Sequence, residues 1–193
     1  MIMLTKYQSK ALLLMLVLII IFLGTFDTLL TIPLAFLIVF TLSTIFTNFL
    51  GSQWTPTPDS SINGVVNEVK KHKTRVFYDL GSGDARIVIA VAKNTNAQAT
   101  GVEIDPLKCL ISSIKIKLSK AENASILRQN FFKADLSGAD MIYCYLPTQT
   151  MAKLEPKIRK LRKGMIIITH CIKFPTLKPI KELKQEKVYI YRI

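Results

Sequence analysis

The sequence predicts an α/β protein, built on a doubly wound, mostly parallel sheet and preceded by an N-terminal transmembrane helical hairpin. Three observations lead to this prediction. Strand-like and helix-like runs alternate from residue 62 onward, a glycine-rich turn follows the first strand-like run, and residues 11–50 are almost entirely apolar. The alternation favours a parallel sheet with helices between its strands, and the apolar stretch favours segments that lie in lipid.

The composition divides the chain into three parts. Residues 1–50 form a predicted membrane anchor, and residues 51–61, which are rich in Pro, Ser and Thr, form a predicted linker. Residues 62–193 form the predicted globular domain. A hydrophobic content of 50% together with a mean hydropathy of +0.32 is too high for a purely soluble protein.

The charge of the chain is concentrated in the globular domain. The formal net charge is +13, and the charges of residues 1–60 cancel. Those charges are carried by Lys6, Lys10, Asp27 and Asp59. The excess therefore belongs to the globular domain and favours anionic partners, such as lipid headgroups or nucleic acid, without choosing between them.

Two membrane spans explain the apolar N-terminal stretch better than one. A single helix over residues 11–50 would be about 60 Å long, twice the roughly 30 Å of a bilayer's hydrocarbon core. We therefore expect spans at residues 7–26 and 29–50, with a turn around residues 24–28. Basic residues flank the pair of spans and are absent from the turn, which places both termini and the globular domain on the cytoplasmic side. A secretory signal peptide is the alternative, although no small-residue cleavage site follows the first apolar run.

The globular domain shows the periodicity of alternating strands and helices. Strands are predicted at residues 75–80, 99–103, 125–128, 140–146, 165–170 and 188–192. Helices are predicted at residues 84–93, 106–120 and 148–163, the last ended by Gly164. Whether the last strand has a hairpin partner within residues 178–186 stays open.

The three cysteines, Cys109, Cys144 and Cys171, predict neither a disulfide framework nor a metal site. Their number is odd, and no two of them have the spacing of metal ligands. Cys144 and Cys171 fall in strand-like apolar runs, where buried free thiols are expected. A reducing, cytosol-facing compartment fits this pattern best.

The turn between the first predicted strand and the first predicted helix contains a candidate ligand site. Its residues are Asp79, Gly81, Ser82 and Gly83. Glycines there allow a ligand to approach the backbone at the helix N-terminus, which suits a nucleotide-like cofactor. A dinucleotide would favour G-x-G-x-x-G, but the sixth position counted from Gly81 is Arg86. S-adenosylmethionine has no phosphate and carries a positive charge, for which the carboxylate of Asp79 is a suitable neighbour. These residues therefore predict S-adenosylmethionine as the cofactor.

Glu103 and Ile104 end the second predicted strand. Glu103 lies 22 residues beyond Gly81, close to the offset at which a carboxylate reaches a ribose in related nucleotide-binding folds. Because a carboxylate can accept both hydroxyl protons, we predict that Glu103 and its neighbour Ile104 contact the ribose. A solvated surface acid is the alternative.

The motif at residues 79–85 resembles the first motif of the class I methyltransferases, D/E-x-G-x-G-x-G, with Ala85 in place of the third glycine. The resemblance implies a Rossmann-like domain that transfers a methyl group from S-adenosylmethionine. It also implies that Asn130 and Phe131, after the third strand, contact adenine. Simple core packing of these two residues is the alternative.

The same resemblance implies that the methyl acceptor binds at the end of the fourth predicted strand. The expected acceptor-site residues are Tyr145, Leu146 and Pro147, because ligands bind outside the carboxyl ends of the strands of such a sheet. The period of two also places Tyr143 and Tyr145 on one face, so a packed aromatic pair is an equal alternative.

Further segments narrow the resemblance to one family. They are DLGSGDARIVI, GVEIDP, NFFKADL, YCYLP, MAKLEPKI and HCIKFP, within residues 77–175. Together they are similar to the family 173 membrane-associated protein lysine methyltransferases, whose animal members modify the ATP synthase c subunit and the adenine nucleotide translocase. The resemblance implies that the substrate is a protein lysine, with a lysine near a bilayer as one candidate. The tryptophan that this family usually has shortly after the FP pair is absent here.

Several alternatives stay open. RNA is a second candidate acceptor because of the positive charge, although no added RNA-binding module is visible. A non-catalytic membrane adaptor is a third candidate, suggested by Ala85. His170 could orient the acceptor or fill a polar gap, and the basic run of residues 153–163 could contact anionic lipid or form a solvated helix face.

Overall fold

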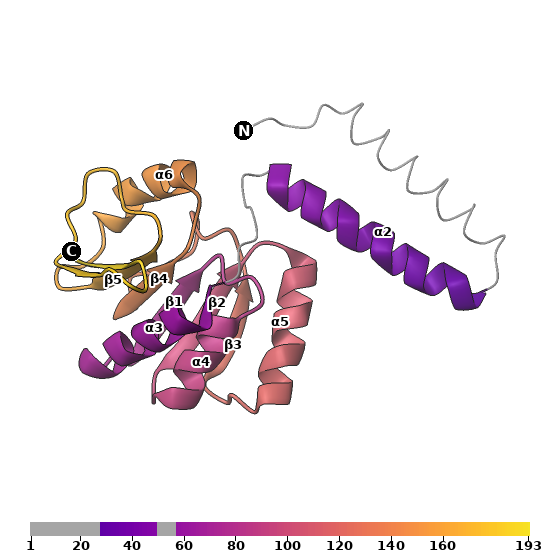
Figure 1. Ribbon diagram of the computed structural model, residues 1–193, viewed down its shortest axis with the longest axis horizontal. Coiled ribbons are helices and arrows are strands. Elements are labelled where there is room, and N and C mark those ends of the chain that lie inside the picture. Colours follow the sequence, from indigo (N-terminus) through magenta and orange to yellow (C-terminus); the bar gives the residue numbers. More distant parts are fainter. Residues whose placement is uncertain (1–27, 50–56) are drawn as a thin grey trace. The chain divides into compact units, whose positions relative to one another are not determined.

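The computed structural model describes residues 28–49 and 57–193 of the chain. The chain divides into two compact units, Met1–Phe46 and Thr47–Ile193. Every strand that the structure describes lies in the second unit (Figure 1).

Most of helix α2 (Thr28–Phe49) lies in the first unit. Its bounds agree with the helix expected at residues 29–50. Six of its described large apolar side chains are exposed, whereas Ile38 and Leu42 are half-buried. The exposed ones are Ile32, Leu34, Phe36, Leu37, Val39 and Phe40. Over the part of the chain that the structure describes, no helix has both the length and the apolar character needed to cross a bilayer. The predicted transmembrane hairpin is therefore not supported, and its first span, residues 7–26, lies outside the described residues.

The second unit is built on a seven-stranded sheet with the order β3-β2-β1-β4-β5-β7-β6. The strands are β1 (Val76–Leu80), β2 (Gln98–Glu103), β3 (Ala124–Arg128), β4 (Met141–Cys144), β5 (Ile166–His170), β6 (Lys181–Leu183) and β7 (Val188–Arg192). The first five strands in this order are parallel, whereas β7 is antiparallel to both β5 and β6. This arrangement confirms the predicted doubly wound, Rossmann-like and mostly parallel sheet.

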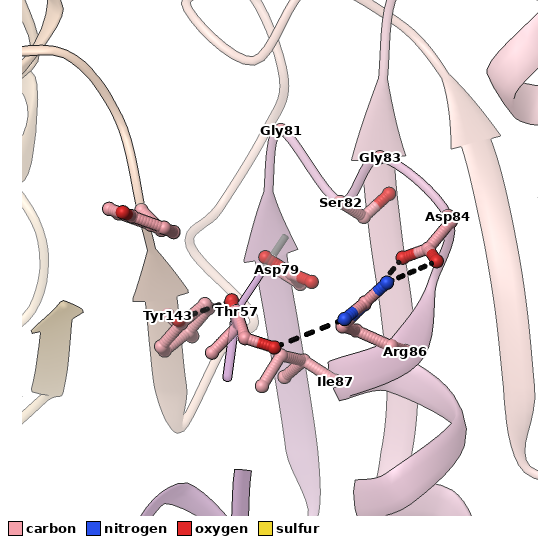
Figure 2. Close-up of a pocket in the computed structure, with 10 residues that line it drawn as sticks. Thr57, Asp79, Gly81, Ser82, Gly83, Asp84, Arg86, Ile87 and Tyr143 are labelled. Carbon is pink, nitrogen blue, oxygen red and sulfur yellow. Dashed lines mark hydrogen bonds and ion pairs between the residues drawn. The ribbon is translucent and has the colours of Figure 1, made fainter. Parts of the chain in front are cut away.

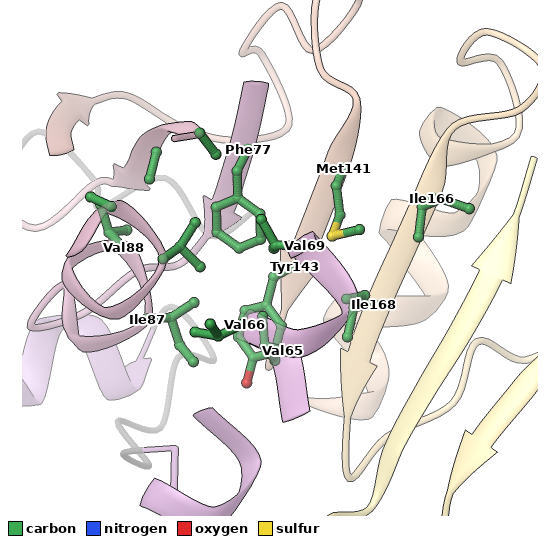
Figure 3. Packing of buried hydrophobic residues seen from close by; sticks show 14 of the residues in the cluster. Val65, Val66, Val69, Phe77, Ile87, Val88, Met141, Tyr143, Ile166 and Ile168 are labelled. Carbon is green, nitrogen blue, oxygen red and sulfur yellow. The ribbon is translucent and has the colours of Figure 1, made fainter. Parts of the chain in front are cut away.

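Helices pack on both faces of the sheet. Alternate strand residues point to opposite faces, so each face has apolar side chains that a helix covers. On one face, Phe77, Met141 and Tyr143 form a buried cluster with apolar side chains of α3 (Asp59–Lys71) and α4 (Arg86–Asn94) (Figure 3). On the other face, Leu80 and Ile142 pack with apolar side chains of α6 (Thr148–Ile158). Helix α5 (Pro106–Ser119) lies beside β2 and the edge strand β3.

Helix α3 was not predicted, and it begins inside the stretch expected to be a linker. Ser61, within residues 51–61, is 2% exposed, so the folded domain starts before residue 62. The apolar residues Ile62, Val65 and Val69 recur at helical spacing and pack into the core. This pattern was available in the sequence, but the Pro- and Ser-rich residues before it hid the start of the helix.

The end of helix α6 differs most from the prediction. Helix α6 ends at Ile158 rather than at residue 163, because the chain tightens into three-residue turns in which Lys160 N–H donates to the Lys157 carbonyl and Leu161 N–H to the Ile158 carbonyl. Strand β6 is the hairpin partner of β7, which answers the question left open for residues 178–186.

Candidate functional site

The glycine turn lies where β1 ends, next to the end of β2. The backbone N–H groups of Gly81 and Ser82 both donate to the Val102 carbonyl, at 2.8 and 3.3 Å. Gly81 has φ +77°, and a Cβ placed there would lie 2.9 Å from the Cδ2 atom of Leu146. The turn therefore requires glycine at position 81 both for its backbone conformation and for the space beside it.

Helix α4 starts directly after the turn, and the residue before it has a left-handed backbone. Ala85, which replaces the third glycine of the motif, precedes α4 with φ 62° and is fully buried. A left-handed conformation costs a residue with a Cβ about 1–2 kcal/mol. The turn therefore keeps the backbone path that a glycine would give, at a cost in stability.

Glu103 connects the end of β2 to the glycine turn. Its Oε2 atom accepts a hydrogen bond from Gly83 N–H at 3.0 Å, and its Oε1 atom accepts from Ile104 and Asp105 N–H at 2.8 and 3.0 Å. The residue is 6% exposed. A carboxylate has about four acceptor positions, and these three bonds leave one for a ligand hydroxyl. Two ribose hydroxyls would have to share a position or displace one backbone donor.

Asp79 lies beneath the turn with other carboxylates near it. Burial raises the pKa of the Asp79 carboxyl well above its ordinary value, and the negative charges of Glu103 and Asp84 raise it further. The side chain is almost inaccessible, with 4% of the residue exposed. A ligand that brings positive charge close to Asp79 would favour its ionised form.

Asp84 is the one acid of this group that is paired with basic side chains. Burial alone would raise its pKa, but hydrogen bonds from Arg86 and Lys115 lower it to about 2. Arg86 binds both carboxylate oxygens, with Nε–Oδ1 3.0 Å and Nη2–Oδ2 2.9 Å, and donates from Nη1 to the Thr57 carbonyl at 3.2 Å. Arg86 therefore holds the first residues of the domain against the glycine turn.

A pocket opens between the glycine turn and β4 (Figure 2). It is lined by Thr57, Asp79, Gly81, Ser82, Gly83, Asp84, Arg86, Ile87, Tyr143 and Tyr145. Thr57 Oγ1 and Tyr143 Oη are hydrogen-bonded at 3.0 Å on one side of the pocket. The buried Ser82 hydroxyl has no hydrogen-bond partner among the described residues, and it lies close to Gly101 of β2.

The pocket brings together part of the predicted site. The expected residues that line it are Asp79, Gly81, Ser82, Gly83 and Tyr145. The lining residues that were not predicted as ligands are Thr57, Asp84, Arg86, Ile87 and Tyr143. Three of these five follow directly from the turn's own sequence. Thr57 gave no local signal because it lies within the predicted linker, far from the turn along the chain.

Other predicted site residues lie around the pocket rather than in its lining. Leu146 is buried against Gly81, and Pro147 precedes α6. Ile104 is 44% exposed beside Glu103. Asn130 and Phe131 begin a turn after β3, and Phe131 packs partly on the core, as the core-packing alternative expects, whereas their contact with adenine stays a prediction.

Tyr145 stands at the boundary between the pocket and a second polar group. Its ring lies edge-on to His170, with centroids 4.5 Å apart. The Nε2 atom of His170 lies 3.1 Å from the Ser61 hydroxyl, which itself donates to the Glu186 carbonyl. Burial and the nearby charge of Lys187 lower the pKa of His170. The imidazole of His170 therefore packs against the Tyr145 ring.

Of the two cysteines that were expected to be buried, Cys144 is buried and Cys171 is not. Cys109 and Cys144 are buried free thiols, and burial raises the pKa of both. Cys171, which was expected to be buried, is exposed, because β5 ends at His170 and the chain turns there with φ 59° at Cys171.

Comparison with known proteins agrees with this geometry. Residues 79–181 match the family model described as the ANTKMT methyltransferase domain. A protein-lysine N-methyltransferase of Saccharolobus islandicus (strain REY15A) is 32% identical over 150 residues, which cover 72% of this chain and 92% of the relative. A lysine N-methyltransferase of Caenorhabditis elegans that acts on the C-subunit of ATP synthase is 29% identical over 94 residues, which cover 48% of this chain and 49% of the relative.

A solved structure gives the same result for the fold. The crystal structure of an RNA methyltransferase from Salinibacter ruber, in complex with S-adenosyl-L-homocysteine, superposes with a TM-score of 0.65 at 29% identity. The superposition covers 72% of this chain and 92% of that one.

Proposed function

Because the chain belongs to the ANTKMT methyltransferase domain family, we propose that its globular domain transfers a methyl group from S-adenosylmethionine to the side-chain amine of a protein lysine. One observation carries the proposal: the buried carboxylate of Glu103 binds Gly83 of the glycine turn, and this turn lines a pocket together with Asp79. The predicted cofactor and the predicted enzyme class both follow from the family and from this site.

The residues of the pocket fit the cofactor. Gly81 and Gly83 line the pocket without side chains, so a ligand can lie close to their backbone. Glu103 would hold the ribose through its remaining acceptor position, and Asp79 would face the cationic end of the cofactor.

The chain's own contribution to catalysis is positioning. The cofactor supplies an electrophilic methyl group, so the protein has to bring a neutral amine in line with it. Tyr145 lines the pocket with its ring packed against His170, which makes it the candidate to align the acceptor amine. Tyr143 is held by Thr57 and forms the wall next to it. Leu146 supports the glycine turn from below, and Pro147 fixes the start of α6.

We also propose that residues 7–50 hold the enzyme at a membrane, with both termini and the catalytic domain on the cytoplasmic side. The exposed apolar side chains along α2 support this placement. The substrate would then be a lysine of a protein at the same membrane, in keeping with the ATP synthase substrate of the Caenorhabditis elegans relative. The full chain should stay with membranes during alkaline carbonate extraction. Complete recovery in the soluble fraction would contradict the placement.

RNA is the second candidate acceptor. The Salinibacter ruber relative is described as an RNA methyltransferase, and the net charge of +13 would attract a polyanion. Anionic lipid is a second candidate partner for the same charge, through the basic residues that follow α6. RNA binding that does not weaken between low and physiological salt would argue against RNA as the acceptor.

Methyl transfer itself provides the decisive test. Membranes and total RNA from cells lacking the protein are incubated with the purified full chain and radiolabelled S-adenosylmethionine. We expect label in protein, on lysines that mass spectrometry finds mono-, di- or trimethylated, and no label with the Glu103→Ala variant. Glu122→Gln is the matched control because Glu122 is an exposed carboxylate. Label in RNA alone would move the assignment to the second candidate, and no label in either would refute the proposed activity.

A further inference from the structure

The turn after β3 satisfies its backbone donors through a single residue. The side-chain Oδ1 atom of Asn130 accepts from Phe132 N–H at 2.9 Å. The backbone carbonyl of Asn130 accepts from Lys133 and Ala134 N–H at 2.8 and 3.1 Å. The side chain and the backbone carbonyl of Asn130 therefore both stabilise the turn.

Three carbonyl groups of the same turn are directed at one distant side chain. The Nζ atom of Lys157, on α6, donates to the carbonyls of Phe131, Phe132 and Ala134 at 2.8, 3.0 and 2.5 Å. An ammonium group has three donors, so this contact uses every one of them. Lys157 was expected to belong to a solvated basic face, but it instead lies partly buried over the turn.

This turn is connected by hydrogen bonds to the cofactor pocket. Gln129 N–H, just before the turn, donates to the Glu103 carbonyl at 2.9 Å. The Glu103 side chain in turn holds Gly83, which lines the pocket. Residues 130–134 are therefore held at two points. Gln129 connects them to Glu103 at the end of β2, and Lys157 connects them to α6.

We propose that Lys157 is a positioning residue for the adenine side of the cofactor site, a role that rests on the proposed function. It acts through the turn at residues 130–134, which carries Asn130 and Phe131. Charge-assisted hydrogen bonds to three carbonyls fix the turn more strongly than a neutral side chain of the same length would, because no other residue type supplies three donors from one atom at the end of an unbranched chain. Burial lowers the pKa of the Lys157 ammonium, and the charge of Asp135 opposes this shift.

The test compares two lysines of the same helix in the full chain. Lys157→Met removes the ammonium and keeps the stem, whereas Lys153→Met changes an exposed lysine one turn away. Titration calorimetry with S-adenosylhomocysteine should give a dissociation constant about tenfold higher for Lys157→Met, and an unchanged one for Lys153→Met. An unchanged constant for Lys157→Met would overturn the inference while leaving the proposed function intact. A wild-type chain that binds no S-adenosylhomocysteine would instead refute the proposed function.

A second ligand separates positioning from a general loss of stability. The analogue of S-adenosylhomocysteine that carries hypoxanthine in place of adenine differs only at the base. The preference for adenine is the dissociation constant of the hypoxanthine analogue divided by that of S-adenosylhomocysteine. This ratio should fall towards one in Lys157→Met, because the disturbed turn no longer recognises the base. Equal weakening of both ligands would overturn the inference.

Glu155→Gln shows whether any loss of an α6 contact has the same effect. The Glu155 carboxylate on this helix accepts hydrogen bonds from Arg159, at the end of α6, and from Thr176, which lies far from residues 130–134 along the chain. Its replacement therefore also removes contacts of α6. We expect Glu155→Gln to lower the melting temperature while it keeps the preference for adenine. Loss of that preference in Glu155→Gln would show that Lys157 has no specific role.

Discussion

Replacing Asp79 by asparagine should stabilise the fold and weaken cofactor binding at the same time. In the unfolded chain this carboxyl titrates near its ordinary pKa of about 4. In the folded domain, burial and then the charges of Glu103 and Asp84 raise its pKa. Between these two pKa values the folded state holds one proton more than the unfolded state. The stability of the wild type therefore falls as the pH rises through that window.

The size of the effect follows from this proton difference. One proton corresponds to a loss of up to about 1.4 kcal/mol in the free energy of unfolding per pH unit. Asparagine does not titrate, so the advantage of Asp79→Asn over the wild type should grow at the same rate. For a chain of this length that is about 3–6 °C in melting temperature per pH unit.

Thermal unfolding followed by circular dichroism measures the difference between about pH 5 and pH 8. Glu122→Gln, an exposed carboxylate, is the control and should show no growing difference. A melting-temperature difference that stays constant over the whole range would show that Asp79 is ionised throughout, and would refute the argument.

Binding should change in the opposite direction. A cationic ligand favours the ionised form of Asp79, so binding to the wild type should release up to one proton and become stronger as the pH rises. Calorimetry in buffers of different ionisation enthalpy measures that release. The Asp79→Asn variant should bind more weakly and release no proton, and equal proton release by both chains would exclude Asp79 as its source.

Three further predictions follow from the site. Glu103→Gln should raise the dissociation constant for S-adenosylhomocysteine about 10–100-fold in calorimetry, because an amide N–H would face a backbone N–H of the turn; an unchanged constant would exclude Glu103 from the ribose site. Gly81→Ala should lower the melting temperature by several degrees, since φ +77° costs about 1–2 kcal/mol and its Cβ would press on Leu146, whereas Gly138→Ala should have no effect because nothing lies within 4 Å of that Cβ. Tyr145→Phe should keep the cofactor affinity and lower kcat in a methyl-transfer assay, and an unchanged kcat would leave its hydroxyl without a role in aligning the acceptor.

The sequence was sufficient for the parts of the site that are local along the chain. The turn at residues 79–85 and the acid at the end of β2 are each defined by a few neighbouring residues, and parallel strands bring them to the same edge of the sheet. The alternation of apolar runs predicted the succession of strands and helices for the same reason.

Contacts between distant segments could not be predicted in this way. Nothing in the basic run of residues 153–163 distinguishes Lys157 from its neighbours, because its role depends on three carbonyls that only the folded turn brings together. Thr57 reaches Tyr143 across 86 positions of sequence, and its local composition is that of a linker.

The Thr57–Tyr143 contact determines where a shortened version of this protein can start. A recombinant fragment designed from the apparent domain boundary at residue 62 would delete one side of the ligand cavity, and with it the carbonyl that Arg86 holds. Such a fragment could still form the sheet and yet bind cofactor poorly, and its inactivity would be mistaken for a need for the hydrophobic N-terminal region. Fragments for crystallisation or soluble assays should therefore begin before Thr57.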